Sequence, residues 1–381
     1  MALTQRRLNR ATLDRQLLLE RQPLSVVDAV ERVVAIQAQE PASPYVALWN
    51  RVAGFDPTDL DSAFSEHDLV KASLMRITLH VVKASEYTTF HEAMLSTLRA
   101  SRLFDRRFKE SGLPIDEVDA LVPHLLELTA EPKTKSEIES ALGERLGSDH
   151  HERAWWALRT FAPLVHAPSS SLPWTFGMPL TYKAAPTTPE RTDTSEAVAQ
   201  LFRRYLEGFG PATAQDFAQF AMLRQGTIRP VLEDMADELI VYEGSSGPRL
   251  FDVPGAALPD EETTAPPRLM AMWDSVLLAY ADRSRIIPEE YRKIVIRNNG
   301  DVLPTLLING HVAGVWRHVE SGIEARAFRP LAKDDWSVLD REAADLIGML
   351  GDRDKAVYGR YRRWWEKASE IAGAEARILG T

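Results

Sequence analysis

Thr134-Lys135-Ser136-Glu137-Ile138 and, further along, Thr213-Ala214-Gln215-Asp216-Phe217 open the same succession of elements. In each segment the threonine can cap a helix, and the acidic residue three positions later falls in the first helical turn, where negative charge is favoured. A break and a second helix follow, predicted over residues 151–161 in the first copy and 227–234 in the second. This repeat decides the fold that we predict.

A pair of short strands closes each copy. The strands are predicted over residues 164–166 and 174–176 in the first copy, and over 239–242 and 249–253 in the second, around turns rich in small residues. Helix, turn, helix and a two-stranded wing is the order of elements in winged-helix domains. The alternative is two unrelated small α+β subdomains, but the matching order and spacing favour the winged helix.

The N-terminal third holds a more divergent third copy. Ser25 caps its first helix, with Asp28 in the first turn. Short helices are predicted over residues 44–49 and 59–64, a strand pair over 69–75 and 78–82, and a long exit helix over 86–109. We therefore predict an α+β fold with three tandem winged-helix motifs.

The last part of the chain has the pattern of a β-meander closed by helices. Strands over 294–297 and 302–308 flank the hairpin turn Asn298-Asn299-Gly300-Asp301, and Asn309-Gly310 forms a second turn before a strand over 311–317. Helices are predicted over 340–350 and 361–371, and linkers over 184–194 and 254–267. The predicted domains are residues 1–112, 113–183, 195–254 and 268–381, with the last packed on the first.

Length, charge and the lack of cysteine narrow the class of protein. The 381 residues carry 45 Lys and Arg against 55 Asp and Glu, a formal charge of −10, which argues against a protein that coats nucleic acid indiscriminately. Without cysteine there is no disulfide, thiol nucleophile or cysteine-bound metal. No stretch has the continuous apolar core of a signal peptide or a membrane span, so we expect a cytoplasmic protein with no membrane contact.

Positive charge is nevertheless concentrated locally. Residues 99–109 hold five cations and one acid, and residues 353–367 hold six cations and two acids, the latter interleaved with Tyr358, Tyr361, Trp364 and Trp365. Arginines beside aromatic rings can bind a DNA backbone and bases. The more ordinary explanation for the tryptophans is burial in a hydrophobic core.

Most enzyme motifs are missing, and one unusual pair of residues remains. The sequence has no HExxH, Walker loop, GxGxxG or GxSxG motif, so we expect neither a metal nor a cofactor. Gln37-Ala38-Gln39 lies just before Pro41 and Pro44, which favour an extended segment in which both carboxamides share one face. Together they can hold a water molecule and a partly charged substrate, or they can simply bond a turn backbone.

Gln37-Ala38-Gln39, Pro44-Tyr45, Leu48-Trp49 and Arg76-Ile77-Thr78-Leu79-His80 together resemble the AlkZ/YcaQ family of winged-helix DNA glycosylases. Trp273-Asp274, Leu277-Leu278-Ala279-Tyr280, Asp282-Arg283-Ser284 and residues 308–316 resemble the later signatures of this family. The resemblance runs over nearly the whole chain. Glutamine at position 39, rather than aspartate, is similar to the AlkZ branch.

The resemblance implies a C-shaped channel built from the winged helices, with the glutamine pair inside it. It implies a monofunctional DNA N-glycosylase that acts on double-stranded DNA containing N7-alkylated or crosslinked purines, as self-resistance to a DNA-alkylating natural product. Gln37 and Gln39 are the expected catalytic pair. Arg76 and His80 are expected to approach the DNA backbone or the lesion, and the turn of Arg297, Asn298, Asn299 and Gly300 to enter a groove beside it.

Further expectations concern the oligomeric state, the alternative function and the role of one aspartate. A channel formed within one chain suggests a monomer, and the two basic stretches are expected to line or flank it. The alternative function is a non-enzymatic winged-helix transcriptional regulator. Asp274 is expected to have a structural role in a turn.

Overall fold

The two threonine-led helices of the repeat begin where the sequence predicts. The computed structural model describes residues 3–147, 150–169, 173–186, 194–243, 247–351, 353, 357–359, 361, 365 and 375–381. In α8 (Lys135–Leu146) and α11 (Ala214–Ala221) the threonine hydroxyl accepts from the backbone N–H of the acidic residue, whose carboxylate accepts from the threonine N–H. These capping boxes satisfy N–H groups that a helix start otherwise leaves unpaired.

Three units of the chain share one order of elements, which is a helix, a short edge strand, two helices and a strand pair. The first unit contains α2 (Val26–Arg32), β1 (Ile36–Gln37), α3 (Ser43–Trp49), α4 (Pro57–Ser65), β2 (Leu69–Ser73) and β3 (Leu79–Lys83). The second unit contains α7 (Ile115–Leu128), β4 (Lys133–Thr134), α8, α9 (His151–Phe161), β5 (Leu164–Ala167) and β6 (Thr181–Ala184). The third unit contains α10 (Thr194–Phe209), α11, α12 (Gln225–Asp234), β7 (Ile240–Glu243) and β8 (Arg249–Asp252), with Ala212 bridging Phe251 in place of an edge strand.

The sheets of these units also share their strand order. The sheets run β1-β3-β2 in the first unit and β4-β6-β5 in the second, all antiparallel. In the third unit β8 likewise lies between Ala212 and β7. The last strand of each unit is therefore central, and it holds the short edge strand in register.

The remaining elements precede or connect the units, lie within them or form the C-terminal region. Helix α1 (Gln5–Arg15) precedes the first unit, and α5 (Ala84–Leu103) and α6 (Arg106–Lys109) connect it to the second; η1 (Met75–Ile77) lies between β2 and β3, and η2 (Ala236–Glu238) between α12 and β7. The C-terminal region has the sheet β13-β12-β11-β10-β9. Its elements are β9 (Arg268–Leu269), η3 (Ser275–Leu277), η4 (Arg283–Arg285), α13 (Glu289–Val295), β10 (Thr305–Ile308), β11 (His311–Val319), β12 (Gly322–Ala327), α14 (Lys333–Leu350) and β13 (Glu375–Leu379).

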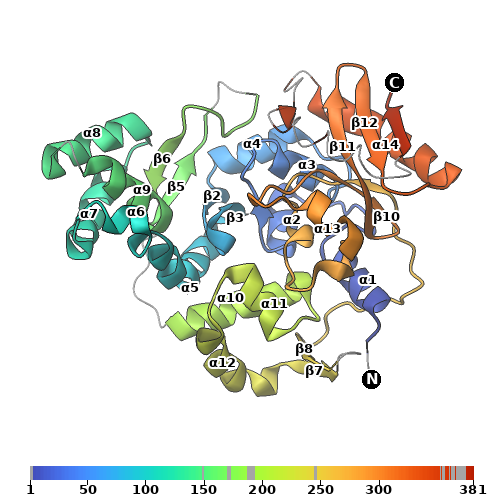
Figure 1. Cartoon of the computed structure of the whole chain (residues 1–381), viewed down its shortest axis with the longest axis horizontal. Coiled ribbons are helices and arrows are strands. Elements are labelled where there is room, and N and C mark those ends of the chain that lie inside the picture. The colour runs from blue at the N-terminus through green and yellow to red at the C-terminus, as the bar shows by residue number, and fades with distance from the viewer. Residues whose placement is uncertain are drawn as a thin grey trace.

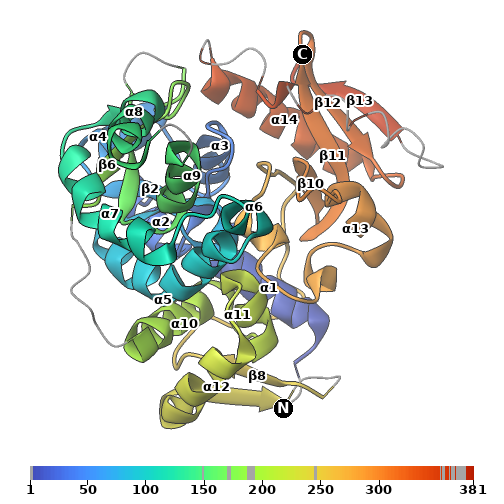
Figure 2. The same ribbon diagram turned by 60° about the vertical axis from the view of Figure 1, so that its left-hand side comes forward.

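The first unit contributes to both of the large hydrophobic cores. Its helices and the C-terminal sheet form one buried cluster, and its strands β2 and β3 share the other with α5 and the second and third units. Figure 1 shows the second unit at one end, the C-terminal sheet with α14 at the other, and the third unit along a third side; Figure 2 gives the turned view. The segment that carries Gln37 thus lies where both cores meet.

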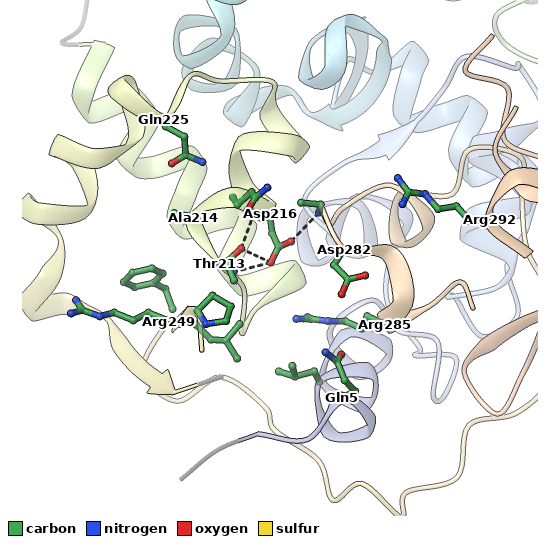
Figure 3. A pocket seen from close by; sticks show the side chains of 15 residues that line it. Gln5, Thr213, Ala214, Asp216, Gln225, Arg249, Asp282, Arg285 and Arg292 are labelled. Atoms are coloured by element: carbon green, nitrogen blue, oxygen red, sulfur yellow. Dashed lines mark hydrogen bonds between the residues drawn. The ribbon is translucent and has the colours of Figure 1, made fainter. Parts of the chain in front are cut away.

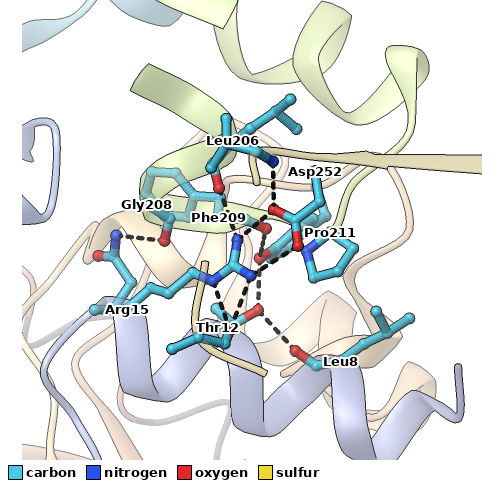
Figure 4. A network of polar contacts seen from close by, with 12 residues as sticks. Leu8, Thr12, Arg15, Leu206, Gly208, Phe209, Pro211 and Asp252 are labelled. Atoms are coloured by element: carbon cyan, nitrogen blue, oxygen red, sulfur yellow. Dashed lines mark hydrogen bonds and ion pairs between the residues drawn. The ribbon is translucent and has the colours of Figure 1, made fainter. Parts of the chain in front are cut away.

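A buried polar network fastens α1 to the third unit (Figure 4). The Arg15 guanidinium forms two hydrogen bonds to the Asp252 carboxylate, at 2.7 and 2.8 Å, and both side chains are almost fully buried. Arg15 also donates to the carbonyl oxygens of Leu206 and Ala257. The charge is therefore fully compensated, which a buried ion pair requires.

One predicted strand of the second unit is wrong. The returning strand is β6, at Thr181–Ala184, rather than residues 174–176. Trp174 and Phe176 are instead buried against the first unit, where their rings lie 4.7 Å from Tyr45 and 4.6 Å from Phe64. Aromatic residues that look like a strand in the sequence therefore hold two units together.

Three other predicted elements need correction. The strand predicted over 294–297 is wrong except at Ile296, which forms an isolated antiparallel bridge with Val302. Helix α13 runs through Val295, because Glu289 and Glu290 begin it and basic residues end it, which complements the helix dipole. The predicted helix over 86–109 is interrupted after Leu103, where Asp105 caps α6. Strand β13 was not predicted, α14 begins at Lys333 rather than at residue 340, and most of the predicted helix 361–371 lies outside the described residues.

Buried histidines predict that acid destabilises this fold. Burial lowers the pKa of His91 to about 4, and it lowers the pKa values of His80 and His166 well below the ordinary value. Each stays neutral in the folded protein, whereas the unfolded chain takes up protons below about pH 6.5. The free energy of unfolding should therefore fall between pH 7 and pH 5, by about 2 kcal/mol for His91 alone. Urea titrations at each pH measure it.

A matched pair of variants isolates the histidine contribution. His91→Gln removes a buried titrating group and should flatten the dependence on pH, whereas His67→Asn changes an exposed histidine and should leave it as in the wild type. Equal pH dependence in the wild type and His91→Gln would show that His91 is not the source.

Candidate active site

The structure places the two glutamines of Gln37-Ala38-Gln39 in unequal settings. Gln37 ends the edge strand β1, directly opposite His80 on β3, and is 3% exposed. The Ala38 N–H still donates to the Leu79 carbonyl, but Gln39 lies in a bend and is exposed. The predicted extended segment therefore ends at Gln37, and only one of the two carboxamides is enclosed by protein.

Arg76 lies at the tip of the β2–β3 hairpin in an unusual backbone conformation. Both Arg76 (φ 55°) and Ile77 (φ 59°) are left-handed, which is rare for a β-branched residue. The Leu74 N–H donates to the Thr78 carbonyl at 3.0 Å and closes the turn. The strand predicted as far as Met75 is wrong here because the chain reverses after Ser73. Strain of this kind, about 1–3 kcal/mol per residue, is characteristic of functional sites.

One nitrogen of Arg76 forms a fork of two hydrogen bonds. Nη2 donates to Oε1 of Gln37 at 2.7 Å and to Nε2 of His80 at 3.1 Å. The Nδ1 of His80 lies 3.0 Å from the Thr78 carbonyl. A guanidinium only donates and a carbonyl only accepts, so the fork fixes the oxygen side of the Gln37 amide and makes His80 the neutral Nδ1–H tautomer.

The fork contains a cation, the guanidinium of Arg76, that has no carboxylate beside it among the described residues. Within the described part of the chain no acidic oxygen lies within ion-pair distance of Arg76; its guanidinium is 5.4 Å from the Phe220 ring centre, and its buried Nε has no partner. Burial lowers the pKa of Arg76 to about 9, and the positive charge of Arg283 lowers it as well, so it is still charged at neutral pH. Burial and the charge of Arg76 hold the pKa of His80 low. No residue in this fork is a general base that titrates near neutrality.

The turn of Arg297, Asn298, Asn299 and Gly300 is closed by the isolated bridge between Ile296 and Val302 and does not join the two predicted strands. The Arg297 N–H donates to the Asp301 carbonyl at 2.8 Å, and Asn298 to Gly300 are exposed. The Gly300 carbonyl accepts from the indole N–H of Trp273 at 2.9 Å. The centre of the Trp273 ring is 5.4 Å from that of the Tyr361 ring, and the Tyr361 hydroxyl donates a hydrogen bond to the Glu40 carboxylate.

Two aromatic side chains therefore connect this turn to the residue after Gln39. The family resemblance contains Trp273, and the basic stretch contains Tyr361, but neither pattern predicts this link. A tryptophan with left-handed φ (56°) inside a buried segment is visible only in the structure.

Other predicted residues have structural roles. Asp274 forms two hydrogen bonds with the buried Arg51, at 2.8 and 2.9 Å, and caps η3, as predicted for a structural residue. In residues 99–109, Arg99 pairs with Asp119, Arg106 with Glu110 and Arg107 with Asp105. This stretch offers less free positive charge than its composition predicts. In the second stretch Arg353 pairs with Asp61, Trp365 is buried, and most other cations lie outside the described residues.

A large cavity lies away from the glutamines. It measures about 910 Å³ and is lined by residues of α11, α12 and β8 on one side and of the segment 281–292 on the other. Figure 3 shows Thr213, Asp216 and Gln225 facing Asp282, Arg285 and Arg292 across it. Over the described ranges no group of three His, Asp or Glu residues is arranged to hold a metal, and no helix is long and apolar enough to cross a bilayer.

The family to which this chain belongs is one of DNA glycosylases. The sequence profile of the family described as DNA glycosylase AlkZ-like matches residues 30–349, and the chain belongs to that family. A relative, the interstrand DNA cross-link repair glycosylase of Streptomyces sahachiroi, is 26% identical in an alignment over 360 residues that covers 89% of this chain and 94% of the relative. The solved structure of Streptomyces sahachiroi DNA glycosylase AlkZ has a TM-score of 0.79 at 22% identity and covers 92% of this chain and 98% of that one.

These similarities confirm the predicted family, its enzyme class and a mixed α and β fold like that of AlkZ. The alternative of a transcriptional regulator is not favoured. The roles of Gln37, Gln39, Arg76, His80 and the hairpin turn remain predictions.

The fork predicts a specific state of His80. Between pH 8 and pH 5, nitrogen NMR of the labelled protein should show His80 as the neutral Nδ1–H tautomer without titration. Arg76→Met removes the adjacent charge and should raise the pKa of His80 towards its ordinary value. Arg102→Met, which removes an arginine bonded to Thr160, is the control and should leave His80 unchanged. An Nε2–H tautomer in the wild type would contradict the geometry.

Proposed function

We propose that this enzyme hydrolyses the N-glycosidic bond of N7-alkylated purines in double-stranded DNA and unhooks interstrand crosslinks made by a DNA-alkylating natural product. The observation that carries the proposal is Gln37, whose amide oxygen is held by Arg76 while its amide nitrogen has no acceptor among the described residues. The relative named above, an interstrand cross-link repair glycosylase, supports the choice of lesion. Protection of a producing cell from its own product is the proposed biological role.

In the proposed mechanism Gln37 and Gln39 hold the attacking water. The amide nitrogen of Gln37 donates to the water oxygen, and the exposed carboxamide oxygen of Gln39 accepts a hydrogen bond from the water. As the bond from water to C1′ forms and the bond to the purine breaks, the proton of the water passes to solvent. Neither amide removes the proton as a general base. This suffices because an N7-alkylated purine is already cationic and leaves as a neutral base, so catalysis rests on positioning and oriented dipoles.

The arrangement of the units is part of the same proposal. We infer that the three units are winged helices, that residues 1–112, 113–183, 195–254 and 268–381 act as domains, and that they surround DNA as a C-shaped channel in a cytoplasmic monomer. The shared element order and strand order of the three sheets support this inference. The turn at Asn298–Gly300 is proposed to enter a groove beside the lesion, with Arg297 at its base; its exposure supports that role. A crosslinked base is tethered to both strands and suits an open channel better than a deep pocket.

Excision of a defined lesion tests the proposed function. The protein is incubated with a duplex crosslinked between guanine N7 atoms, and separately with one containing 7-methylguanine, and abasic product is measured on a denaturing gel under single-turnover conditions. Gln37→Ala and Gln39→Ala should each slow excision by about 10²-fold or more, as loss of an oriented polar group does in other enzymes.

The control is Gln200→Ala, which changes an exposed glutamine on α10 and should excise as fast as the wild type. Absence of abasic product with the wild type on both duplexes would refute the proposed lesion. Full activity in Gln37→Ala and Gln39→Ala would refute the proposed catalytic pair.

A further inference from the structure

A second arginine, Arg283, also has no carboxylate partner among the described residues. Arg283 begins η4, and none of its donors has an acceptor among the residues that the structure describes; its Nε is buried as well. Burial lowers the pKa of Arg283, and the charge of Arg292 adds to this effect. Neither Arg283 nor Arg76 therefore has the counter-charge that a half-buried guanidinium normally finds.

Helix α11 places these two arginines beside each other. The Phe220 carbonyl, in the last turn of α11, lies 3.5 Å from Nη1 of Arg76. One turn earlier, Asp216 accepts a hydrogen bond from the Ala281 N–H at 2.9 Å, two residues before Arg283. Arg76 and the segment just before Arg283 therefore both contact α11, and the charge of Arg283 lowers the pKa of Arg76.

Arg292 extends this group towards the large cavity. It lines that cavity, and its nearest carboxylate, Glu289, is 3.8 Å away on an exposed surface. Figure 3 shows its guanidinium group at the side of the cavity formed by the segment 281–292. Arg292 therefore brings to the cavity a further cation from the segment that contains Arg283.

Other buried arginines of this protein have oxygen partners. Arg15 and Arg51 are each held by two bonds to one carboxylate, from Asp252 and Asp274. Arg10 and Arg285 have no carboxylate partner in the described part of the chain, but backbone carbonyl and side-chain oxygens accept from their guanidinium groups. Arg283 differs from all four because no acceptor holds it among the described residues.

We propose that Arg76 and Arg283 form a clamp for one phosphate of the DNA backbone next to the lesion, with Arg292 guiding the strand towards it. A phosphodiester is an anion with two accessible oxygens, which a pair of guanidinium forks matches in charge and geometry. The inference rests on the proposed function, since it assumes that damaged DNA is the ligand. It also explains why Arg76 has no carboxylate partner in the described part of the protein. The bound phosphate would neutralise Arg76, which lies beside a substrate that develops positive charge.

The salt dependence of binding to an undamaged duplex tests the clamp without relying on catalysis. Affinity is measured by fluorescence anisotropy at several salt concentrations for the wild type, Arg283→Gln, Arg283→Lys and the control Arg341→Gln, an exposed arginine on α14. Arg283→Gln should bind about five- to tenfold more weakly, with a slope of log K against log salt smaller by about 1. Arg283→Lys should keep most of the slope, and Arg341→Gln should match the wild type.

Thermal unfolding separates binding from folding. Arg283 makes no hydrogen bond to a described residue, so Arg283→Gln should melt at the wild-type temperature or slightly above it. An unchanged affinity and salt slope in Arg283→Gln would overturn the clamp, as would an equal loss in Arg341→Gln.

A neutral methylphosphonate then locates the phosphate. Placed one at a time beside a 7-methylguanine, it should weaken binding by the wild type at one position and cause no further loss in Arg283→Gln. Equal losses in both proteins at every position would overturn the clamp. A wild type that shows the salt effect but excises no lesion supports the clamp and refutes the proposed function, so the two failures are distinguishable.

Discussion

The hydrogen-bond fork from Arg76 to Gln37 and His80 is the interaction on which the candidate active site depends. It fixes the orientation of one amide and the tautomer of one imidazole with a single nitrogen atom. The cost is high, because the guanidinium is half-buried without a carboxylate and the chain around it adopts a left-handed conformation at two non-glycine residues. A fold that tolerates both costs at one point must be strongly held elsewhere.

The surrounding structure supplies that support. Arg51 and Asp274 tie the first unit to the C-terminal region, and Arg15 and Asp252 tie α1 to the third unit, both as nearly fully buried pairs. Trp174 and Phe176 pack the second unit against the first. The first unit shares both hydrophobic cores, so the short strand with Gln37 is fixed from two sides. The arginines of these two structural ion pairs thus have carboxylate partners. Arg76 and Arg283, where DNA is proposed to bind, have no carboxylate partner among the described residues.

Local signals in the sequence predicted local structure well. Thr134 and Thr213 begin helices as their capping boxes require, and Ile36 and Gln37 are extended as predicted from the nearby prolines, although α2 already ends at Arg32. The misassigned segments depend on distant contacts. Residues 174–176 have strand-like composition but pack on another unit, and Arg76 has no nearby residue in the sequence to show that it turns back onto Gln37. In the sequence Arg283 stands out only as part of a family signature. Its lack of a counter-charge among the described residues can be recognised only in the structure.

The most direct test of the account is a double-mutant cycle on the chemical step. Excision of 7-methylguanine is measured at saturating enzyme for the wild type, Arg76→Met, Gln37→Ala and the double variant, so that differences in DNA binding do not contribute. If Arg76 acts on catalysis by holding Gln37, the losses are strongly non-additive and the double variant is within about twofold of Gln37→Ala. Losses that multiply would show that the two residues act independently and would contradict the central role of the fork.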